Sequence, residues 1–423
     1  MVTLLPAPAP AHGFYAEGFE PVARTFAMHL ARGEELGAAF AAYHQGEAVV
    51  DLWGGVADPE TGRPWRQETS CLVFSVTKGL TAMAMHLLAD RGKLAWDAPV
   101  ASIWPGFARA GKESISLRTL MNHRAGLPAL DEPVRFEDCL HPGGQAHLRD
   151  VLERQRPRWD PGRKQGYHAV TFGMYAREVI EQIAGESAGT LLRRELFEPL
   201  SAEVWVGTPP GEQGRLAALE PPSVPGRVAR MVLEALLGGS AEARLARASL
   251  RPGSLALQAF TNPPPGPEGP ARYIRPDAVG AELLWASATA TARGLARAYL
   301  PFAQGGVVEG RRYFPAASVA PLQERQGFSE RDEILQKPLG WSQGFLKEEG
   351  GVFSPNPRSF GHAGMGGSLG WCDPEEGLTF GYVMNRMDWR IRSPRVLALS
   401  RALYGSRGLS GASADRSAGR AQK

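Results

Sequence analysis

The sequence predicts an α/β (α+β) fold: an antiparallel sheet flanked by helices, built from both chain ends, with a large, mostly helical insertion. Strand-like apolar runs occur near both ends, whereas the middle repeats apolar residues at three- and four-residue spacing. Hydrophobic residues make up 43% and charged residues 22% of the 423 residues, as in ordinary globular proteins. No apolar run approaches the roughly 18–20 residues that a membrane helix needs.

The N-terminal part predicts one helix followed by a hairpin. The first dozen residues, which repeat Pro and Ala, are expected to be a loose lead-in, and helical spacing predicts a helix over 14–33. Gly37–His44 and 48–54 predict two strands, joined at Gln45-Gly46-Glu47 by a tight turn. A further strand is expected at 69–74.

The middle of the chain predicts helices. Apolar residues from Gly79 follow a helical period that stops at Gly92. The segment 207–283 is rich in Pro and Gly, with a shorter helical piece around 228–237. A further helix starts at Thr291, whose hydroxyl can cap it. The same period predicts three more helices, at 117–123, 171–184 and 190–197.

The C-terminal part returns to strands. Short runs bounded by turn residues predict strands at 341–347, 359–365, 367–372 and 378–385, and a helix follows at 396–404. If the two ends share one sheet, residues 1–75 and 285–406 form a sheet domain and 76–284 a mainly helical domain. Residues 407–423 are expected to be a disordered tail. A cleft between the two domains is the natural place for a site.

Composition narrows the classes of function. The formal net charge is only +3, and the sequence has no cluster of basic residues of the kind that neutralises phosphates, so we expect no nucleic-acid partner. We expect no membrane partner either. Cys71, Cys139 and Cys372 form no disulfide or metal-ligand pattern. Residues 1–13 do not show the basic start and apolar core that are typical of a signal peptide, so a cytoplasmic setting is expected. His141 and His147 lack zinc-ligand partners, and no nucleotide-binding glycine loop occurs, so no metal or cofactor is expected. The oligomeric state is left open.

A serine three residues before a lysine, Ser75-Val76-Thr77-Lys78, stands where a strand-like run gives way to a helix. At a helix start both side chains point the same way, and free N–H groups favour negative charge. A partly desolvated lysine has its pKa lowered toward neutrality. These properties suit a serine nucleophile with a lysine as proton acceptor. The alternative is a helix cap followed by a surface lysine.

A tyrosine is the second chemical element. Tyr167 lies in a loop just before a helix and can reach a cleft. Beside a cationic lysine its phenol is expected to ionise more easily and to act as a general base. Taken alone, such a tyrosine is more often ordinary packing.

The third element is His362-Ala363-Gly364-Met365 on a late strand. Its small residues let a substrate lie close to the backbone. A free N–H there can pair with the N–H of Ser75 as an oxyanion hole. Taken alone, His362 is more often a structural histidine.

A competing serine motif lies nearby. Gly366-Gly367-Ser368-Leu369-Gly370 matches Gly-x-Ser-x-Gly, which needs a strand, a sharp turn and then a helix. The residues after the motif, 371–374, predict a strand end and a turn followed by another strand, so no helix is available to present Ser368. No histidine follows His362 to complete an α/β-hydrolase triad. We expect a glycine-rich strand edge along the cleft.

The three elements, in this order, resemble the serine β-lactamase/penicillin-binding-protein superfamily, whose signature includes Ser-x-x-Lys. They are most similar to family VIII carboxylesterases and β-lactamase-related proteins, which look like class C β-lactamases. The stretch LMNHRAGL at 120–127 is similar to the family's Leu-x-x-His-x-x-Gly-Leu, and the likeness runs from about residue 14 to 405. It implies a β-lactamase/transpeptidase-like fold.

The resemblance also implies roles for individual residues. Ser75 would be the nucleophile, Lys78 and Tyr167 would share the acid/base work, and the N–H groups of Ser75 and Met365 would form the oxyanion hole. The residues expected to contact substrate are His362, Ala363, Gly364 and His168.

Two departures from class C enzymes bear on the substrate. Ala169 stands where those enzymes have Asn, and His362-Ala363-Gly364 stands where they have Lys-Thr-Gly. The cation and the hydroxyl that would hold a β-lactam carboxylate are lost, which favours uncharged esters.

The expected function is therefore a serine hydrolase that cleaves short- to medium-chain carboxylic esters through an acyl-enzyme on Ser75. Three alternatives stay open: a β-lactamase or D-amino-acid peptidase, an acyltransferase of the same fold, and a non-catalytic binding protein.

Overall fold

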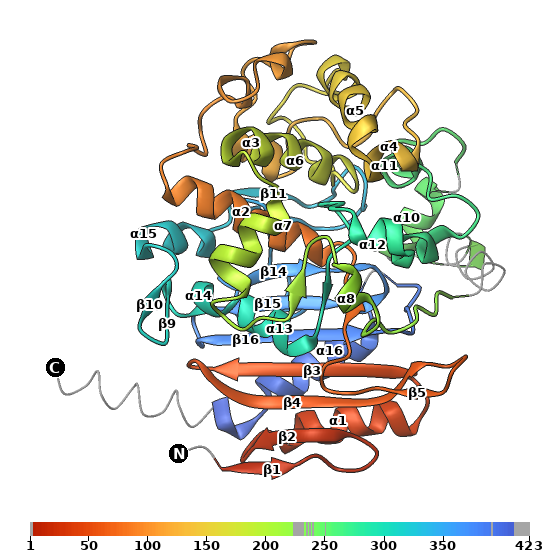
Figure 1. Cartoon of the computed structure of the whole chain (residues 1–423), viewed down its shortest axis with the longest axis vertical. Helices are drawn as coiled ribbons and strands as arrows, with labels where there is room; N and C mark the ends of the chain where they lie inside the picture. Colours follow the sequence, from red (N-terminus) through yellow and green to blue (C-terminus); the bar gives the residue numbers. More distant parts are fainter. Residues whose placement is uncertain are drawn as a thin grey trace.

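The two ends of the chain meet in one sheet. The computed structural model describes residues 3–222, 232, 233, 236, 238, 241–249, 251–390 and 392–409. Strand β3 (Gly37–His44) runs antiparallel to β16 (Leu378–Met384), with Phe40 opposite Tyr382. Figure 1 shows these strands side by side in the lower half of the molecule. The prediction that both ends build one antiparallel sheet is thereby confirmed.

The described sheet has eleven strands, and all of its pairs are antiparallel. Its order is β1 (Leu4–Pro6), β2 (His12–Ala16), β4 (Glu47–Asp58), β3, β16, β15 (Leu369–Asp373), β14 (Phe360–Ala363), β13 (Phe345–Lys347), β12 (Leu339–Ser342) and β11 (Gly327–Ser329), with β5 (Arg63–Pro64) beside β4.

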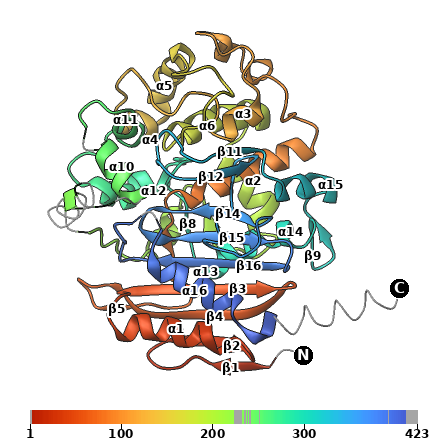
Figure 2. The ribbon, with the colours of Figure 1, turned by 180° about the vertical axis from the view of Figure 1, so that it is seen from behind.

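Helices cover both faces of the sheet. On one face α1 (Glu20–Ala31) and α16 (Pro394–Tyr404) contact each other and share an apolar core with the strands. On the other face lie α13 (Ala292–Ala298), α14 (Leu300–Ala303) and α2 (Val76–Asp90). Figure 2 shows α16 in front of the sheet when the molecule is seen from behind. Because α2 contacts β13 and β14, it joins the sheet to the helical segments above it.

The middle of the chain is mostly helical, as predicted. Its described helices are α3 (Leu117–Met121), α4 (Phe136–Leu140), α5 (Pro142–Arg154), α6 (Thr171–Ala184), α7 (Ala188–Leu192) continued by a π-helix (Arg193–Phe197), α8 (Pro210–Gln213), α10 (Ala241–Ser249), α11 (Leu255–Thr261) and α12 (Pro276–Gly280). Most of the helical piece expected at 228–237 lies outside the described residues. The division into two domains stays a prediction.

Smaller elements complete the described chain. The strand expected at 69–74 is β6 (Cys71–Leu72), which pairs with β8 (Thr289–Ala290) in a separate sheet that also holds β7 (Val204–Trp205). The remaining elements are β9 (Val307–Val308), β10 (Arg311–Arg312), α15 (Ala316–Val319) and the 3-10 helices Val100–Ser102, Pro105–Ala108, Gly269–Ile274, Ala320–Gln323 and Met365–Gly367.

Four predictions were wrong in detail. The supposed lead-in contains β1, which pairs with β2, and the helix predicted from residue 14 begins only at Glu20. The strand predicted over 341–347 is a hairpin of β12 and β13, because Gln343 (φ 46°) and Gly344 (φ 90°) turn the chain. Of the tail predicted from 407, residues 410–423 lie outside the described part, and Leu409 is buried in the core.

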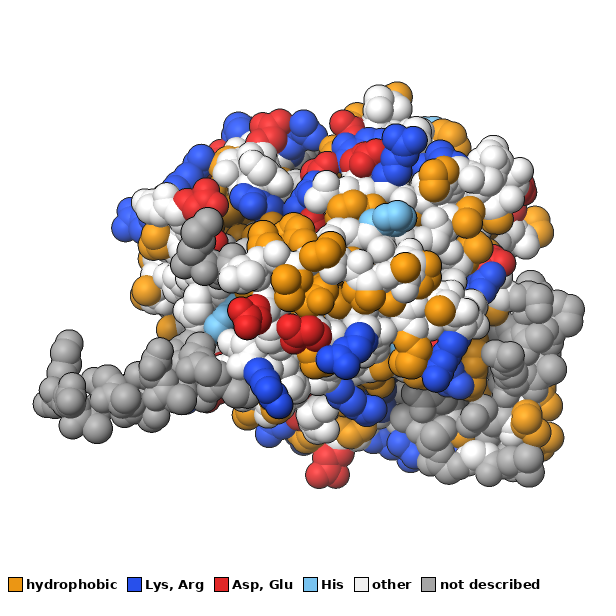
Figure 3. Space-filling model, turned by 90° about the horizontal axis from the view of Figure 1, so that it is seen from below, with side chains coloured by type: hydrophobic (Ala, Val, Ile, Leu, Met, Phe, Trp, Pro, Cys, Tyr) orange, Lys and Arg blue, Asp and Glu red, His pale blue; other side chains and the backbone are white. Residues whose placement is uncertain are grey.

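The end of the molecule that carries β1 exposes a mixed surface. Figure 3 shows apolar side chains gathered near the centre of this face, with basic and acidic side chains around them. Both signs of charge are interspersed there. In the described residues, no helix combines the length and apolar character required to cross a membrane.

Candidate active site

Ser75 lies at the N-terminus of α2 on a sharp turn. The preceding residue, Phe74, has a φ of 46°, a left-handed conformation that costs free energy in a bulky residue. The third motif packs directly on this turn, since a Cβ added to Gly364 would lie 2.2 Å from the carbonyl oxygen of Val73. Only glycine fits that approach, so the predicted nucleophile and the glycine of the third motif are neighbours.

Lys78 is buried beside the serine. Its Nζ lies 3.2 Å from Ser75 Oγ and donates a hydrogen bond to the carbonyl oxygen of Trp285 at 3.0 Å. The side chain is completely buried, and this desolvation lowers the pKa of Lys78 well below its ordinary value. The lysine is therefore predisposed to be a neutral amine.

Tyr167 completes the cluster. Its ring lies 5.1 Å from Lys78 Nζ and stacks on Trp341 at 5.9 Å, and its hydroxyl is hydrogen-bonded to Ser75. Burial raises the pKa of Tyr167, and the charge of Asp332 raises it further. The expectation that this phenol ionises more easily was wrong, because burial both removes the charge from Lys78 and penalises a phenolate. Burial therefore favours the neutral phenol, and the hydrogen bond with Ser75 opposes this shift only in part.

The third motif brings a neutral histidine and a backbone amide. His362 lies on β14, its Nδ1 is 2.8 Å from the carbonyl oxygen of Ala363, and burial lowers its pKa to about 3. Met365 begins the 3-10 helix Met365–Gly367 and is 42% exposed. Among the described residues, neither the Ser75 N–H nor the Met365 N–H donates to a protein carbonyl. Both amides are thus available to an oxyanion.

His168, expected to contact substrate, is fully buried. Its ring Nε2 accepts a hydrogen bond from the backbone N–H of Leu127 at 3.3 Å. The backbone N–H of His168 donates a hydrogen bond to His123 Nδ1 at 3.0 Å. Burial lowers the pKa of His168 to about 3. The structure gives this side chain no exposed surface toward a substrate.

Ser368 of the competing motif is also buried. Its hydroxyl donates to the carbonyl oxygen of Val73 at 2.9 Å, and β15 follows it directly. The strand–turn–helix context of a nucleophile elbow is missing at this serine.

Three groups near the site were missed by the sequence reasoning. Asp332 accepts a hydrogen bond from the N–H of Tyr167 at 3.0 Å, Trp341 stacks on the Tyr167 ring, and the carbonyl of Trp285 orients Lys78. Every residue has a backbone carbonyl, so the sequence cannot show which one contacts Lys78. Asp332 stands in a run of charged residues that resembles a solvated turn.

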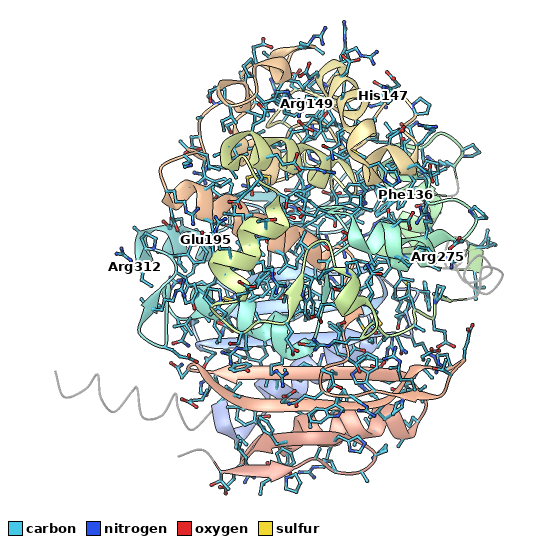
Figure 4. The ribbon with its side chains drawn as sticks, in the orientation of Figure 1. Phe136, His147, Arg149, Glu195, Arg275 and Arg312 are labelled. Carbon is cyan, nitrogen blue, oxygen red and sulfur yellow. The ribbon has the colours of Figure 1, made fainter. Side chains whose placement is uncertain are left out.

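A separate cavity of about 440 Å³ lies between the segments 133–137 and 264–268. Phe136 forms part of its wall and packs on Tyr273, which packs in turn on Phe74 with ring centroids 6.1 Å apart. Figure 4 shows Phe136 and Arg275 on the same side of the molecule. No predicted site residue lines this cavity. Within the described residues, no group of three or more His, Cys, Asp or Glu is placed to hold a metal ion.

Comparisons with known proteins identify the family of the chain. The sequence matches the family described as Beta-lactamase over residues 22–401. LipL of Mycobacterium tuberculosis, named an esterase/beta-lactamase, is 34% identical over 376 residues, which cover 87% of this chain and 81% of LipL.

Solved structures of similar proteins share the fold. A family VIII carboxylesterase is 34% identical, with a TM-score of 0.81 over 93% of this chain and 99% of that structure. A penicillin-binding protein homologue from Caulobacter crescentus is 30% identical, with a TM-score of 0.79 over 94% of this chain and 100% of that structure. These matches span nearly the whole sequence and confirm the resemblance, so the chain belongs to the β-lactamase family.

Proposed function

We propose that this protein is a serine hydrolase that cleaves carboxylic esters through an acyl-enzyme on Ser75. The observation that carries the proposal is the buried Lys78 amine, held between Ser75 Oγ and the carbonyl oxygen of Trp285. The names of the carboxylesterase and esterase relatives support an ester as the substrate.

In the first step Lys78 takes the hydroxyl proton of Ser75. One N–H of the neutral amine donates to the Trp285 carbonyl, so its lone pair can face the serine. Ser75 Oγ then forms a bond to the ester carbonyl carbon, and the carbonyl oxygen becomes an oxyanion. The N–H groups of Ser75 and Met365 stabilise that oxyanion, and each such donor is worth about 2.7–4 kcal/mol.

Tyr167 acts as the acid when the tetrahedral intermediate collapses. Its phenol gives a proton to the departing alkoxide as the ester C–O bond breaks, and it recovers a proton from Lys78. In the second half-reaction Lys78 takes a proton from water as the water oxygen bonds to the acyl carbon. When the bond from that carbon to Ser75 Oγ breaks, the pair returns the proton to Ser75 Oγ, and the carboxylic acid is released. Each proton taken up by the pair is returned, so the cycle closes.

The surroundings of the site favour an uncharged, apolar substrate. His362 stands where class C enzymes have a lysine, and its pKa of about 3 keeps it neutral. Phe260 lies 6.4 Å from the Tyr167 ring and is 39% exposed, and Met365 is 42% exposed. Apolar side chains at the mouth of the site suit an acyl chain of short to medium length.

An ester panel tests the proposal. Wild-type protein should hydrolyse p-nitrophenyl butyrate, and Ser75→Ala, shown to be folded by circular dichroism, should be inactive. Full activity of the folded Ser75→Ala variant would overturn the proposal.

A second candidate is β-lactam hydrolysis, favoured by the esterase/beta-lactamase name of LipL. The neutral third motif argues against efficient turnover of an anionic β-lactam. Nitrocefin hydrolysis with a kcat/KM above that for p-nitrophenyl butyrate would favour this candidate over the esterase.

We also propose a cytoplasmic location. Its support is chemical: the three cysteines, all described, are free and buried, and none forms a disulfide.

A further inference from the structure

Three consecutive backbone amides around Tyr167 are each tied to a buried group. The N–H of Gly166 donates to the carbonyl oxygen of His123, that of Tyr167 to Asp332 Oδ1, and that of His168 to His123 Nδ1, all at 3.0 Å. This segment is neither helix nor strand. Without these bonds, no backbone ladder would fix the position of the Tyr167 ring.

Asp332 binds Tyr167 from one side. Its side chain is fully buried, and Oδ1 also accepts from the N–H groups of Ile334 and Leu335, both at 2.9 Å. Oδ2 accepts from Gln165 Nε2 at 3.4 Å. Burial raises the pKa of Asp332, and the N–H donors lower it. A buried carboxylate is costly, and an exposed aspartate would cap the same turn at lower cost. The hydrogen bond from the Tyr167 N–H explains why this carboxylate is buried despite the cost.

His123 binds the segment from the other side. It is buried, has a φ of 59°, and lies 5.0 Å from the Tyr167 ring and 4.1 Å from Trp341. Because Nδ1 accepts a hydrogen bond from the His168 N–H, the ring proton sits on Nε2. Burial lowers the pKa of His123 well below its ordinary value, so this acceptor stays available.

We propose that Asp332 and His123 are positioning residues that hold Tyr167 in contact with Ser75. The inference rests on the proposed function. Neither residue touches the reacting atoms. Both hold the backbone at or next to Tyr167, which is the proposed general acid. A displacement of about 1 Å in a reacting group typically costs on the order of 100-fold in rate. The charge of Asp332 also raises the pKa of Tyr167, which keeps the phenol protonated.

The first test compares two changes at Asp332. Asp332→Asn keeps an oxygen for the Tyr167 N–H, whereas Asp332→Ala removes it. We expect kcat on p-nitrophenyl butyrate, per folded protein, to fall about 100-fold in the alanine variant and less than about tenfold in the asparagine variant. KM should change little in both, because no substrate contact is lost.

Asp373 supplies the matched control. It is equally buried and also accepts from two turn amides, those of Glu375 at 3.1 Å and Glu376 at 3.3 Å. Asp373→Ala should lower the melting temperature but leave kcat per folded protein nearly unchanged. Equal losses of kcat in Asp332→Ala and Asp373→Ala would overturn the proposal.

The second test uses the acceptor geometry of His123. Asparagine places an oxygen near the position of Nδ1 and tolerates a positive φ, whereas glutamine moves its acceptor toward the position of Nε2. His123→Asn should therefore retain more kcat than His123→Gln after correction for folded fraction. The reverse order would contradict the assignment.

A structural readout separates this inference from the proposed function. In a crystal structure of Asp332→Ala the Tyr167 hydroxyl should have left Ser75, and an unmoved hydroxyl would overturn the inference whatever the activity. If folded Ser75→Ala is fully active, the proposed function fails instead. If Ser75→Ala is inactive and Asp332→Ala keeps the wild-type kcat, only the positioning role fails.

Discussion

Lys78 Nζ and Ser75 Oγ lie 3.2 Å apart on the first turn of one helix, in surroundings that exclude water from the lysine. Desolvation favours the neutral amine, and the neutral amine is the form that accepts a proton. One helical spacing and one buried environment thus supply both the proximity and the basicity that the proposed mechanism requires.

The pH dependence of activity follows from this burial. Because the pKa of Lys78 is lowered well below 10.5, kcat/KM should rise as the lysine loses its proton and reach a plateau far below pH 10.5. Stopped assays across the pH range on an uncharged ester measure this limb. Lys78→Arg, which cannot lose its proton, should abolish activity at every pH. A rate that still climbs at pH 10.5 would contradict the lowered pKa.

Removal of the Tyr167 hydroxyl should slow the reaction by several orders of magnitude. Tyr167→Phe keeps the ring that stacks on Trp341 and deletes only the hydroxyl that is hydrogen-bonded to Ser75. Its effect should not add to that of Lys78→Ala, because the two groups act as a unit. Tyr299→Phe is the matched control, since this buried hydroxyl lacks a hydrogen-bond partner among the described residues. The control should keep near wild-type kcat, and a Tyr167→Phe enzyme as active as the control would argue against the acid role.

The backbone amide of Met365 can be deleted with little strain. Gly364 has φ −106° and ψ 157°, which a residue before proline adopts readily, and Met365 opens a 3-10 helix. Met365→Pro should therefore lower kcat by about 10²–10³-fold, the usual cost of losing one oxyanion donor. Met365→Ala keeps the amide and should alter mainly KM. Similar kcat values in the two variants would exclude this N–H from the oxyanion hole.

The free energy of unfolding should fall as the pH is lowered, because buried histidines such as His86 resist protonation in the folded state. Burial lowers the pKa of His86 from 6.5 to about 3, so the folded state binds its proton less tightly than the unfolded chain. The stabilisation from the neutral ring is fully present above pH 6.5 and is lost progressively as pH falls toward 3. His86→Phe preserves a flat ring against Phe345 and should reduce the change in unfolding free energy between pH 7 and pH 5 by about 2 kcal/mol. Urea titrations at the two pH values measure it, and an unchanged difference would refute it.

Helix and strand bounds were predicted correctly where an apolar segment ends at clear turn residues. Helix Thr171–Ala184 and strand Gly37–His44 have the predicted bounds. The helix carries a clear apolar period, and the strand is one short apolar run that ends at the turn residues Gln45 and Gly46. The hairpin at Gln343 was missed because buried residues on both sides of the turn look like one continuous strand. β1 was missed because its Pro-Ala surroundings suggest a loose segment.

Some residues of the candidate site could also be predicted from the sequence, and others could not. A short motif identified Ser75 and Lys78, since both lie on one helical turn. Asp332 is 165 residues from Tyr167 in the sequence, and only the folded chain brings them together. The direction of the Tyr167 pKa shift also depends on burial, which local sequence does not report.

The most direct test of the central claim is to find which residue carries the acyl group during turnover. Enzyme mixed with p-nitrophenyl butyrate, quenched in acid within milliseconds and digested, should show a butyryl mass increment on the peptide that contains Ser75, and Ser75→Ala should show none. A butyryl group on Ser368, or a butyryl adduct that persists in the Ser75→Ala variant, would contradict it.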